Sequence, residues 1–444
     1  MDLTRRLFLS TPAAAALLGA GVRQKLVLPS ARQLAWHKLE TYAFLHFTIN
    51  TFTDREWGYG DEDPRLFNPT AFDAGAIVDA LARGGMKAVI LTCKHHDGFC
   101  LWPTQTTRHS VVSTGWRDGK GDVVREISQA AAKRGLKFGV YLSPWDRNHR
   151  AYGTPEYIDV YRTQLRELLT SYGPIFEVWH DGANGGDGYY GGAREKRTID
   201  KHSYYDWPRT WELVRSLQPD AVIFSDVGPD IRWVGNEKGF ANETCWATYD
   251  PVGENGGPAS PGDTKSREGM TGHRNGSHWL PAECDVSIRP GWFWHEKENG
   301  RVKTGTELFD LYLRSVGRGA SFLLNVPPDR RGLLHEKDVA SLAEFRRLVD
   351  DAFRQPAGHG GRLSLKLSGP CRFIRLREDI RKGQRIDAFV VEVGSHGAWS
   401  KIAEGTSVGS CRIIRLDAPL QAEGLRLRIP QSSAPPAVAE FAAY

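Results

Sequence analysis

The chain has 444 residues, enough for one large domain and a smaller one, and its 40% hydrophobic and 25% charged residues are ordinary for a globular protein. The formal net charge of +5 is modest and no basic run stands out, which argues against a nucleic-acid partner. Six cysteines are too few for a disulfide scaffold, and without a Cys-x-x-Cys pair or a His-Glu-x-x-His helix the sequence predicts no zinc site.

Residues 1–24 have the layout of an export signal. A polar start, the pair Arg5-Arg6 and a short apolar stretch precede an Ala/Gly-rich exit, and TRRLFLS resembles a twin-arginine signal. The apolar stretch is too short to predict a membrane span. We therefore expect a protein exported to a bacterial periplasm, with no membrane anchoring after the signal is removed.

Residues 31–353 alternate between short apolar runs and stretches of helical periodicity. Buried strands are predicted at YAFLHF, KAVILTC, KFGVYLS, IFEVWH, AVIFSD and ASFLLNV. The helical stretches between them, such as DAGAIVDALARGG and DVVREISQAAAKRG, start at Asp and stop at Gly. This alternation implies parallel strands joined by crossover helices.

The pattern loosens after Asp226 into a Gly-, Pro- and Trp-rich region that ends near Asn299. The sequence therefore predicts an α/β fold, a (β/α)8-like barrel with elaborated late loops. A doubly wound open sheet is the alternative. It is disfavoured because no Gly-rich phosphate loop follows the first strand.

Residues 361–444 change to short alternating segments separated by Gly, Pro and Asp: GRLSLKLSG, CRFIRLRED, RIDAFVVEVG, CRIIRLD and LRLRIP. This pattern is typical of a C-terminal antiparallel β-sandwich. We expect the sandwich to support the barrel or to bind sugar as an accessory.

The predicted strand ends carry polar and aromatic side chains. Asp181 follows IFEVWH and is itself followed by glycines, an arrangement that core packing does not explain. In a parallel barrel the carboxyl ends of the strands meet at one mouth, where catalytic residues collect. Histidines, aromatic rings and carboxylates together suit a neutral polyhydroxyl ligand, because imidazoles bind hydroxyls and aromatic rings cover C–H faces.

Five motifs, in this order, resemble the α-L-fucosidases of glycoside hydrolase family 29: YAFLHFTINTFTDREW, LTCKHHDGFCLWPT, VYLSPWD, EVWHDGA and DVSIRPGWFWH. The resemblance covers essentially the whole mature sequence. It implies a retaining glycosidase that removes terminal α-L-fucose through a fucosyl-Asp intermediate, with Asp181 as nucleophile. The sugar-binding residues that it implies are His46, Glu56, Trp57, His95, His96, Tyr141, Arg232 and Trp294.

The general acid/base that the resemblance indicates is Glu283, in WLPAECDVSIRPGWFWH, which resembles the subgroup that favours α1,3/4-linked fucose. A carboxyl group that stays protonated near neutral pH needs apolar surroundings or a neighbouring negative charge. Glu283 has the most apolar sequence neighbours of the acids in the irregular region. The rival acids are Glu243, Glu254 and Asp285.

A fucosidase of this kind needs no metal or organic cofactor, and its partner is a fucosylated oligosaccharide or glycoprotein glycan. Two other hypotheses remain: a catalytically silent glycan-binding protein, and a metallohydrolase that uses His46, His95, His96 and Asp181. Adjacent His95 and His96 would point to opposite faces of a regular strand, which fits metal geometry poorly. The oligomeric state is not predicted.

Overall fold

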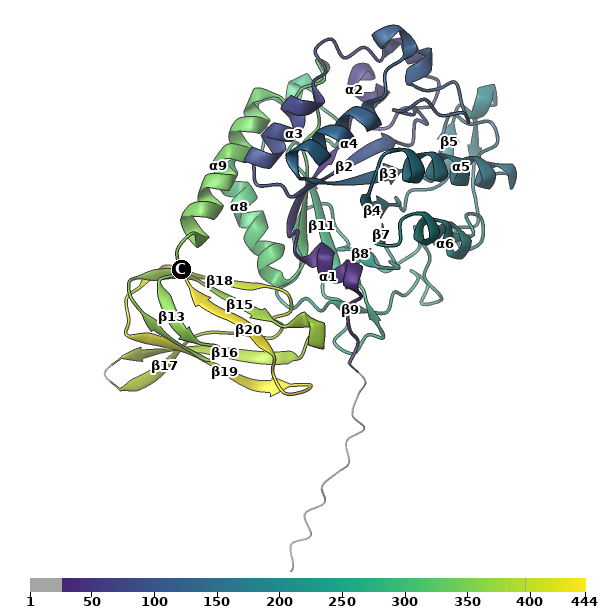
Figure 1. Ribbon diagram of the computed structural model, residues 1–444. Coiled ribbons are helices and arrows are strands. Elements are labelled where there is room, and N and C mark those ends of the chain that lie inside the picture. Colours follow the sequence, from purple (N-terminus) through teal and green to yellow (C-terminus); the bar gives the residue numbers. More distant parts are fainter. Residues whose placement is uncertain (1–25, 396) are drawn as a thin grey trace, which may run out of the picture.

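The computed structural model describes residues 26–395 and 397–444, and the side chains of residues 359–361 are not considered. The predicted export signal lies outside the described residues. A closed parallel barrel of eight strands forms the larger unit, and antiparallel sheets form the C-terminal unit below it (Figure 1). No helix in the described ranges is long and apolar enough to cross a membrane.

The barrel strands follow the order β1-β12-β11-β8-β7-β4-β3-β2. Their bounds are β1 Thr41–Leu45, β2 Ala88–Lys94, β3 Lys137–Leu142, β4 Ile175–Trp179, β7 Val222–Ser225, β8 Ile231–Trp233, β11 Ala282–Ser287 and β12 Ser321–Asn325. Every pair in the barrel is parallel, so all eight carboxyl ends lie at one mouth. The predicted barrel is confirmed.

The longer helices cover the outside of the barrel, whereas the short ones lie at its ends or in its loops (Figure 1). The helices are α1 Ala31–His37, α2 Ile49–Thr53, α3 Ala74–Arg83, α4 Val123–Arg134, α5 Glu156–Ser171, α6 Trp207–Leu217, α7 Ser266–Gly269, α8 Gly305–Arg314 and α9 Glu336–Phe353. The predicted Asp caps are present, since Asp73 and Asp122 accept hydrogen bonds from backbone N–H groups of the first turns of α3 and α4.

The irregular region supplies two barrel strands that the sequence pattern did not reveal. β8 has only three residues, and β11 contains Glu283, Asp285 and a serine, so neither is a recognisable apolar run. No crossover helix separates β7 from β8, and residues 234–281 form a long excursion with a small two-stranded sheet, β9 Thr248–Tyr249 and β10 His278–Trp279. The barrel therefore departs from a regular (β/α)8 repeat on this side.

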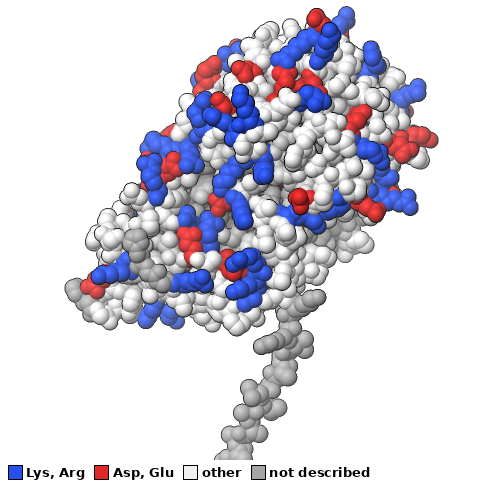
Figure 2. Space-filling model, viewed as in Figure 1, with Lys and Arg blue, Asp and Glu red and all other residues white. Residues whose placement is uncertain are grey.

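Two apolar layers form the core of the barrel. Ala43 and Leu45 of β1 face outward into the layer between strands and helices, whereas Tyr42 and Phe44 face inward, as the two-residue period of a strand requires. Trp36 of α1 belongs to the inner cluster, so this first helix closes one end of the barrel interior. On the face shown in Figure 2, basic and acidic side chains are interspersed over both units.

The C-terminal unit consists of a five-stranded sheet, β13-β14-β19-β16-β17, and a three-stranded sheet, β18-β15-β20. The strands are β13 Gly358–Gly361, β14 Ser364–Leu367, β15 Cys371–Glu378, β16 Ile386–Ser395, β17 Ala398–Gly405, β18 Arg412–Leu420, β19 Gly424–Ser432 and β20 Val438–Ala443. Alternate residues of both sheets share one apolar core, as in a sandwich.

The sandwich contacts the barrel through apolar and polar groups. Ile413 of β18 belongs to the same buried cluster as the barrel helices, and Phe373 of β15 packs on Phe353 of α9 with ring centroids 5.3 Å apart. Gln384 and Ser407 accept hydrogen bonds from the backbone N–H groups of Ala247 and Cys245, at 2.8 and 2.9 Å. The sandwich thereby holds part of the 234–281 excursion.

Truncation after Phe353 should yield a protein that aggregates or melts at a lower temperature than the full chain, because it exposes the apolar surface beneath Phe373 and Ile413. Size-exclusion chromatography and thermal melting measure both effects. A soluble fragment with the full activity and melting temperature of the parent would contradict the support role.

Candidate active site

A cavity of about 270 Å3 lies at the carboxyl ends of the barrel strands. Three aromatic side chains, Trp179, Phe224 and Trp233, contribute to its lining. Five carboxyl groups also line it, and they come from four strands or their following loops and from the long excursion: Asp181, Asp226, Glu237, Glu254 and Asp285. So many acids at one apolar-walled cavity indicate a chemical function, because each would otherwise be easier to accommodate in water.

Asp181 lies at the point where β4 ends, and its carboxylate is held by two donors. The Tyr141 hydroxyl donates to Oδ2 at 2.9 Å, and the Ala183 backbone N–H donates to Oδ1 at 2.7 Å. Burial raises the pKa of Asp181, and these two hydrogen bonds oppose the rise because they favour the ionised form. The preceding His180 faces away, with Nδ1 2.8 Å from the Tyr161 hydroxyl of α5.

The glycines after Asp181 permit a close approach of two loops. A Cβ on Gly262 would lie 2.3 Å from the carbonyl oxygen of Gly182, so only glycine fits at this contact. The Gly262 backbone N–H reaches Asp226 Oδ2 at 2.9 Å. The excursion between β8 and β11 is thus hydrogen-bonded to the loop after β7 and lies close against the loop that carries Asp181, and it forms one wall of the cavity.

Three predicted histidines gather beside Asp181. The rings of His46 and His95 have centroids 5.7 Å apart, those of His95 and His96 4.0 Å apart, and His96 Nε2 lies 3.9 Å from Asp181 Oδ2. Burial lowers the pKa of His46 and of His96 to about 3, and it lowers that of His95 well below its usual range. All three imidazoles are therefore neutral at physiological pH.

Trp57 and Glu56 lie on the loop after β1. The Trp57 ring is 54% exposed and has its centroid 5.1 Å from that of His96, so its surface is available to a ligand. Glu56 accepts hydrogen bonds from the backbone N–H groups of Trp292 and Phe293, and its Oε1 lies 2.7 Å from His295 Nε2. Residues 292–295 engage both carboxylate oxygens of Glu56. Glu56 therefore supports this aromatic segment.

None of the eight predicted sugar-binding residues lines the cavity itself, and two of them also lie apart from the group beside Asp181. Arg232 is fully buried beneath the excursion and donates to the carbonyl oxygens of Gly269 and Trp246, both at 3.0 Å, and of Leu280. Its guanidinium therefore fastens the loop. Trp294 is buried with Arg330 over its ring at 5.8 Å. Its neighbour Trp292 lies at the site instead, with its ring centroid 5.0 Å from that of His46.

Glu283 also lies outside the cavity, in the barrel interior near the start of β11. Its carboxylate accepts hydrogen bonds from the Trp179 indole at 2.7 Å and from the Tyr42 hydroxyl. Burial raises the pKa of Glu283 and that of its neighbour Glu177, and the charge of Glu283 raises the pKa of Glu177 further. The side chain thus holds Trp179 from the layer below the cavity. Apolar sequence neighbours indicated burial correctly but not access to a ligand.

Glu237 is one of two cavity acids, with Asp226, that the sequence did not single out. It follows β8 in RWVGNE, and the Trp292 indole N–H lies 3.3 Å from its Oε2. The side chain of Glu237 is exposed, but partial desolvation at the cavity raises its pKa, and the nearby negative charge of Asp181 raises it further. The signal was the acid four residues after a barrel strand. It was hidden because a three-residue strand leaves no visible apolar run.

The other cavity acids are more constrained or more solvated. Burial, with a contribution from the charge of Asp181, raises the pKa of Asp226 to about 7. Asp285 lies within β11, where the Trp233 indole donates to it at 2.8 Å, and burial raises its pKa strongly. Glu254 is exposed on the excursion. Among the described residues, no group of three or more His, Cys, Asp or Glu side chains is arranged to hold a metal ion.

Comparisons with known proteins agree with this geometry. The family model described as Alpha-L-fucosidase matches residues 28–350. Alpha-L-fucosidase 1 of Arabidopsis thaliana is 41% identical over 94% of this chain and 88% of its own length. The crystal structure of a glycoside hydrolase 29 family member from an unknown rumen bacterium is 42% identical, with a TM-score of 0.88 over 94% of this chain and 77% of the other.

A Ruminococcus gnavus family 29 fucosidase solved in complex with fucose is 27% identical and has a TM-score of 0.81, covering 94% of this chain and 95% of the other. The family model that matches residues 28–350 and the relatives that cover nearly the whole chain agree on one family. The chain belongs to the alpha-L-fucosidases of glycoside hydrolase family 29 and is a glycoside hydrolase.

Proposed function

We propose that this enzyme removes terminal α-L-fucose with retention of configuration, with Asp181 as nucleophile and Glu237 as general acid/base. The observation that carries the proposal is that both carboxyl groups line one cavity, each held by a single aromatic donor. Burial raises the pKa of both groups, but Tyr141 and Ala183 stabilise the anion of Asp181, whereas the charge of Asp181 raises the pKa of Glu237 further. Two carboxyl groups in opposite protonation states are what a retaining glycosidase requires.

In the first step, an oxygen of Asp181 bonds to the anomeric carbon while the glycosidic C–O bond breaks. The electron pair of that bond leaves with the aglycone oxygen, which takes the proton of Glu237. In the second step, Glu237 removes a proton from water, whose oxygen bonds to the anomeric carbon as the ester bond to Asp181 breaks. Fucose is released, and both carboxyl groups return to their starting states.

The charge of Asp181 explains how one residue can serve as acid and then as base. While Asp181 is ionised, its charge raises the pKa of Glu237 and keeps the proton available. Once Asp181 is esterified, that charge is gone and the pKa of Glu237 falls, so that it can accept a proton from water. Asp285 and Asp226 are poorer candidates because the Trp233 indole and the Gly262 N–H hold them at 2.8 and 2.9 Å, whereas the Trp292 indole lies 3.3 Å from Glu237.

The substrate that we propose is an α1,3/4-linked fucose on a branched glycan. The support is the wall formed by the excursion, where Glu254, Thr264 and Ser266 line the cavity beside the catalytic acids. Glu254 is the exposed member of this group, and the sugar next to fucose would be bound beside it. We further propose export to the periplasm, as the twin-arginine-like segment at residues 1–24 indicates.

Replacement of Asp181 by Asn should lower the turnover of an aryl α-L-fucoside by at least about three orders of magnitude, because the covalent route is closed. Steady-state kinetics measures the loss, and circular dichroism checks that the variant is folded. Near-normal turnover in a folded variant would overturn the assignment of the nucleophile.

Glu237→Ala should be slow on substrates with poor leaving groups and less impaired on activated aryl fucosides, because it lacks the acid. Azide should restore its turnover and yield a fucosyl azide of retained configuration, since a small anion reaches the esterified Asp181. Glu254→Ala is the matched control, because it removes another acid of the same cavity and should give no azide product.

The same experiment also tests Glu283, the acid/base that the sequence indicates. Glu283→Gln should lower the melting temperature or disturb Trp179, because Glu283 accepts the Trp179 indole hydrogen bond inside the barrel. Azide should not rescue it. If azide rescues a Glu283 variant but not Glu237→Ala, the acid/base is Glu283 after all.

The enzyme should hydrolyse α1,3/4-linked fucose in a branched trisaccharide with a higher kcat/KM than α1,2-linked fucose, because the excursion can contact the neighbouring sugar. Chromatography of the released fucose from both substrates measures the preference. Equal efficiency on the two linkages would sink this part of the proposal.

A further inference from the structure

We infer that Asn325 and Ser143 are positioning residues that fix the tautomers of His46 and His96. Both imidazoles then present an unprotonated Nε2 to the site, so the pocket accepts hydrogen bonds from sugar hydroxyls and offers none from these two rings. The inference rests on the proposed binding of fucose beside Asp181. It adds a requirement for the ligand: the sugar hydroxyls that contact these two rings must donate hydrogen bonds to them.

The side-chain amide of Asn325, at the end of β12, has an orientation that its partners determine. Its Nδ2 donates to the carbonyl oxygen of Trp292 at 2.7 Å and to Ser287 Oγ at 2.9 Å. Its Oδ1 accepts from the backbone N–H of His46 at 3.2 Å. A carbonyl cannot donate and a backbone N–H cannot accept, so the amide cannot be flipped.

The orientation of Asn325 decides the proton on His46. His46 Nδ1 lies 3.0 Å from Asn325 Oδ1, which can only accept, so Nδ1 carries the hydrogen. A neutral imidazole has one N–H, so His46 Nε2 bears a lone pair. This nitrogen belongs to a ring packed against Tyr141 and Trp292, with centroids 5.8 and 5.0 Å away, on the side of the candidate site.

Ser143 performs the same task for His96. The single hydroxyl hydrogen of Ser143 is donated to the carbonyl oxygen of Trp145 at 2.7 Å. His96 Nδ1 lies 2.7 Å from Ser143 Oγ and must therefore donate to it. The remaining nitrogen, Nε2, is unprotonated and lies 3.9 Å from Asp181 Oδ2, too far for a hydrogen bond between them.

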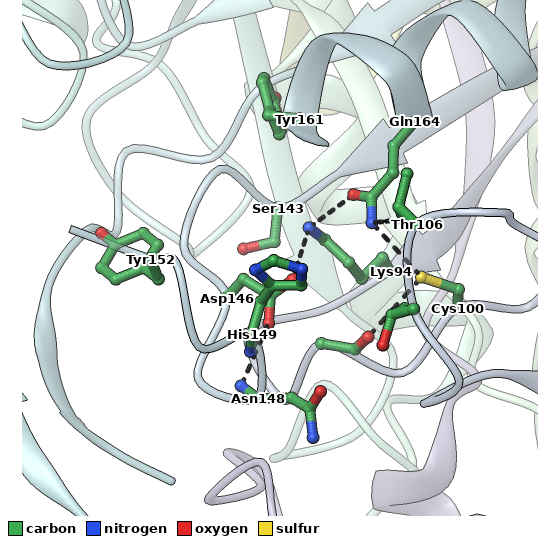
Figure 3. A network of polar contacts seen from close by, with 12 residues as sticks. Lys94, Cys100, Thr106, Ser143, Asp146, Asn148, His149, Tyr152, Tyr161 and Gln164 are labelled. Atoms are coloured by element: carbon green, nitrogen blue, oxygen red, sulfur yellow. Dashed lines mark hydrogen bonds and ion pairs between the residues drawn. The ribbon is translucent and has the colours of Figure 1, made fainter. Parts of the chain in front are cut away.

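A buried ion pair holds the loop that carries Ser143. Figure 3 shows Lys94, the last residue of β2, among Asp146, Ser143 and Gln164 of α5. Lys94 Nζ lies 3.2 Å from Asp146 Oδ2 and 2.8 Å from Gln164 Oε1, and both charged side chains are buried. The other Asp146 oxygen accepts from the backbone N–H groups of Asn148 and His149. The loop is thereby fixed to the strand that precedes His95 and His96.

The surroundings keep both rings neutral. The titratable groups around them are His95 on the same loop as His96, Tyr141 on β3, Asp181 after β4, and the cations Lys94 and Arg147. Burial, assisted by these cations, lowers the pKa of His96 to about 3. Burial also lowers the pKa of His46 to about 3. The acceptor nitrogens therefore persist across the physiological pH range.

His95 provides an internal contrast. Its Nδ1 is buried without a hydrogen-bond partner among the described residues, so no neighbour dictates which nitrogen is protonated.

Fluorine can accept a hydrogen bond only weakly and cannot donate one. A fucose analogue with fluorine in place of a hydroxyl that meets His46 or His96 should therefore bind no better than the corresponding deoxy analogue.

The test uses nitrogen NMR of the full-length enzyme carrying isotope-labelled histidine, with signals assigned by His46→Gln and His96→Gln. Both histidines should show a protonated Nδ1 and an unprotonated Nε2 at neutral pH, with or without fucose. An Nε2–H tautomer for either residue would overturn the inference for that residue. This readout does not depend on activity, so it stands even if the enzyme fails to hydrolyse fucosides.

Two variants link the tautomers to binding. Asn325→Asp places a carboxylate against His46 Nδ1 and raises the pKa of the ring, so that Nε2 becomes protonated below that raised pKa. Inhibition by fucose should then weaken by about tenfold or more as the pH falls through neutrality, whereas the parent enzyme shows no such ionisation. Ser143→Ala introduces no charge and should weaken fucose about equally at every pH.

For Asn325 the pH profile separates positioning from a merely structural role, and for Ser143 the nitrogen NMR of the parent enzyme does so. If Asn325 were only structural, Asn325→Asp would lower affinity by the same factor at all pH values, and that result would contradict the inference for His46. If Ser143→Ala bound fucose as tightly as the parent enzyme, the inference for His96 would fail. Should Asn325→Asp not fold, the NMR of the parent enzyme still decides the tautomer of His46.

Discussion

The proposed mechanism depends on one constraint, that Asp181 remains an anion in a largely buried cavity. Burial alone would raise its pKa and favour the neutral acid, which is a poor nucleophile. Tyr141 and Ala183 counter this by donating to the two oxygens, and they come from different places in the fold, a neighbouring strand and the following turn. The parallel barrel makes this possible because it brings the carboxyl ends of β3 and β4 together.

The negative charge of Asp181 also affects the pKa values of the acids around it. It raises the pKa of Glu237 across the cavity and contributes to the raised pKa of Asp226. The histidines next to Asp181 stay neutral, which leaves the negative charge uncompensated by a cation. Below the cavity, Glu283 accepts the hydrogen bond of the Trp179 indole, so a buried carboxylate inside the barrel supports the aromatic lining.

The sequence predicted the barrel, the sandwich and the place of Asp181 because apolar strands of five to seven residues and capped helices are visible as patterns. It missed β8 and β11, since one is too short and the other carries acids that only the barrel interior satisfies. That omission led to Glu283, which lies in the barrel interior, and left Glu237, which lines the cavity, unnoticed. Arg232 and Trp294 were misplaced for a related reason: a side chain's residue type does not show whether it faces a ligand or fastens a loop.

The central claim is that fucose becomes covalently attached to Asp181, and mass spectrometry of a trapped enzyme tests it most directly. A fucosyl fluoride with a second fluorine at carbon five keeps all its hydroxyls while slowing breakdown of the ester, so the intermediate should accumulate. After proteolysis, the account predicts one labelled peptide, with the mass of the fluorinated sugar on Asp181. Labelling of another carboxyl group, or inactivation of the enzyme without any labelled peptide, would contradict it.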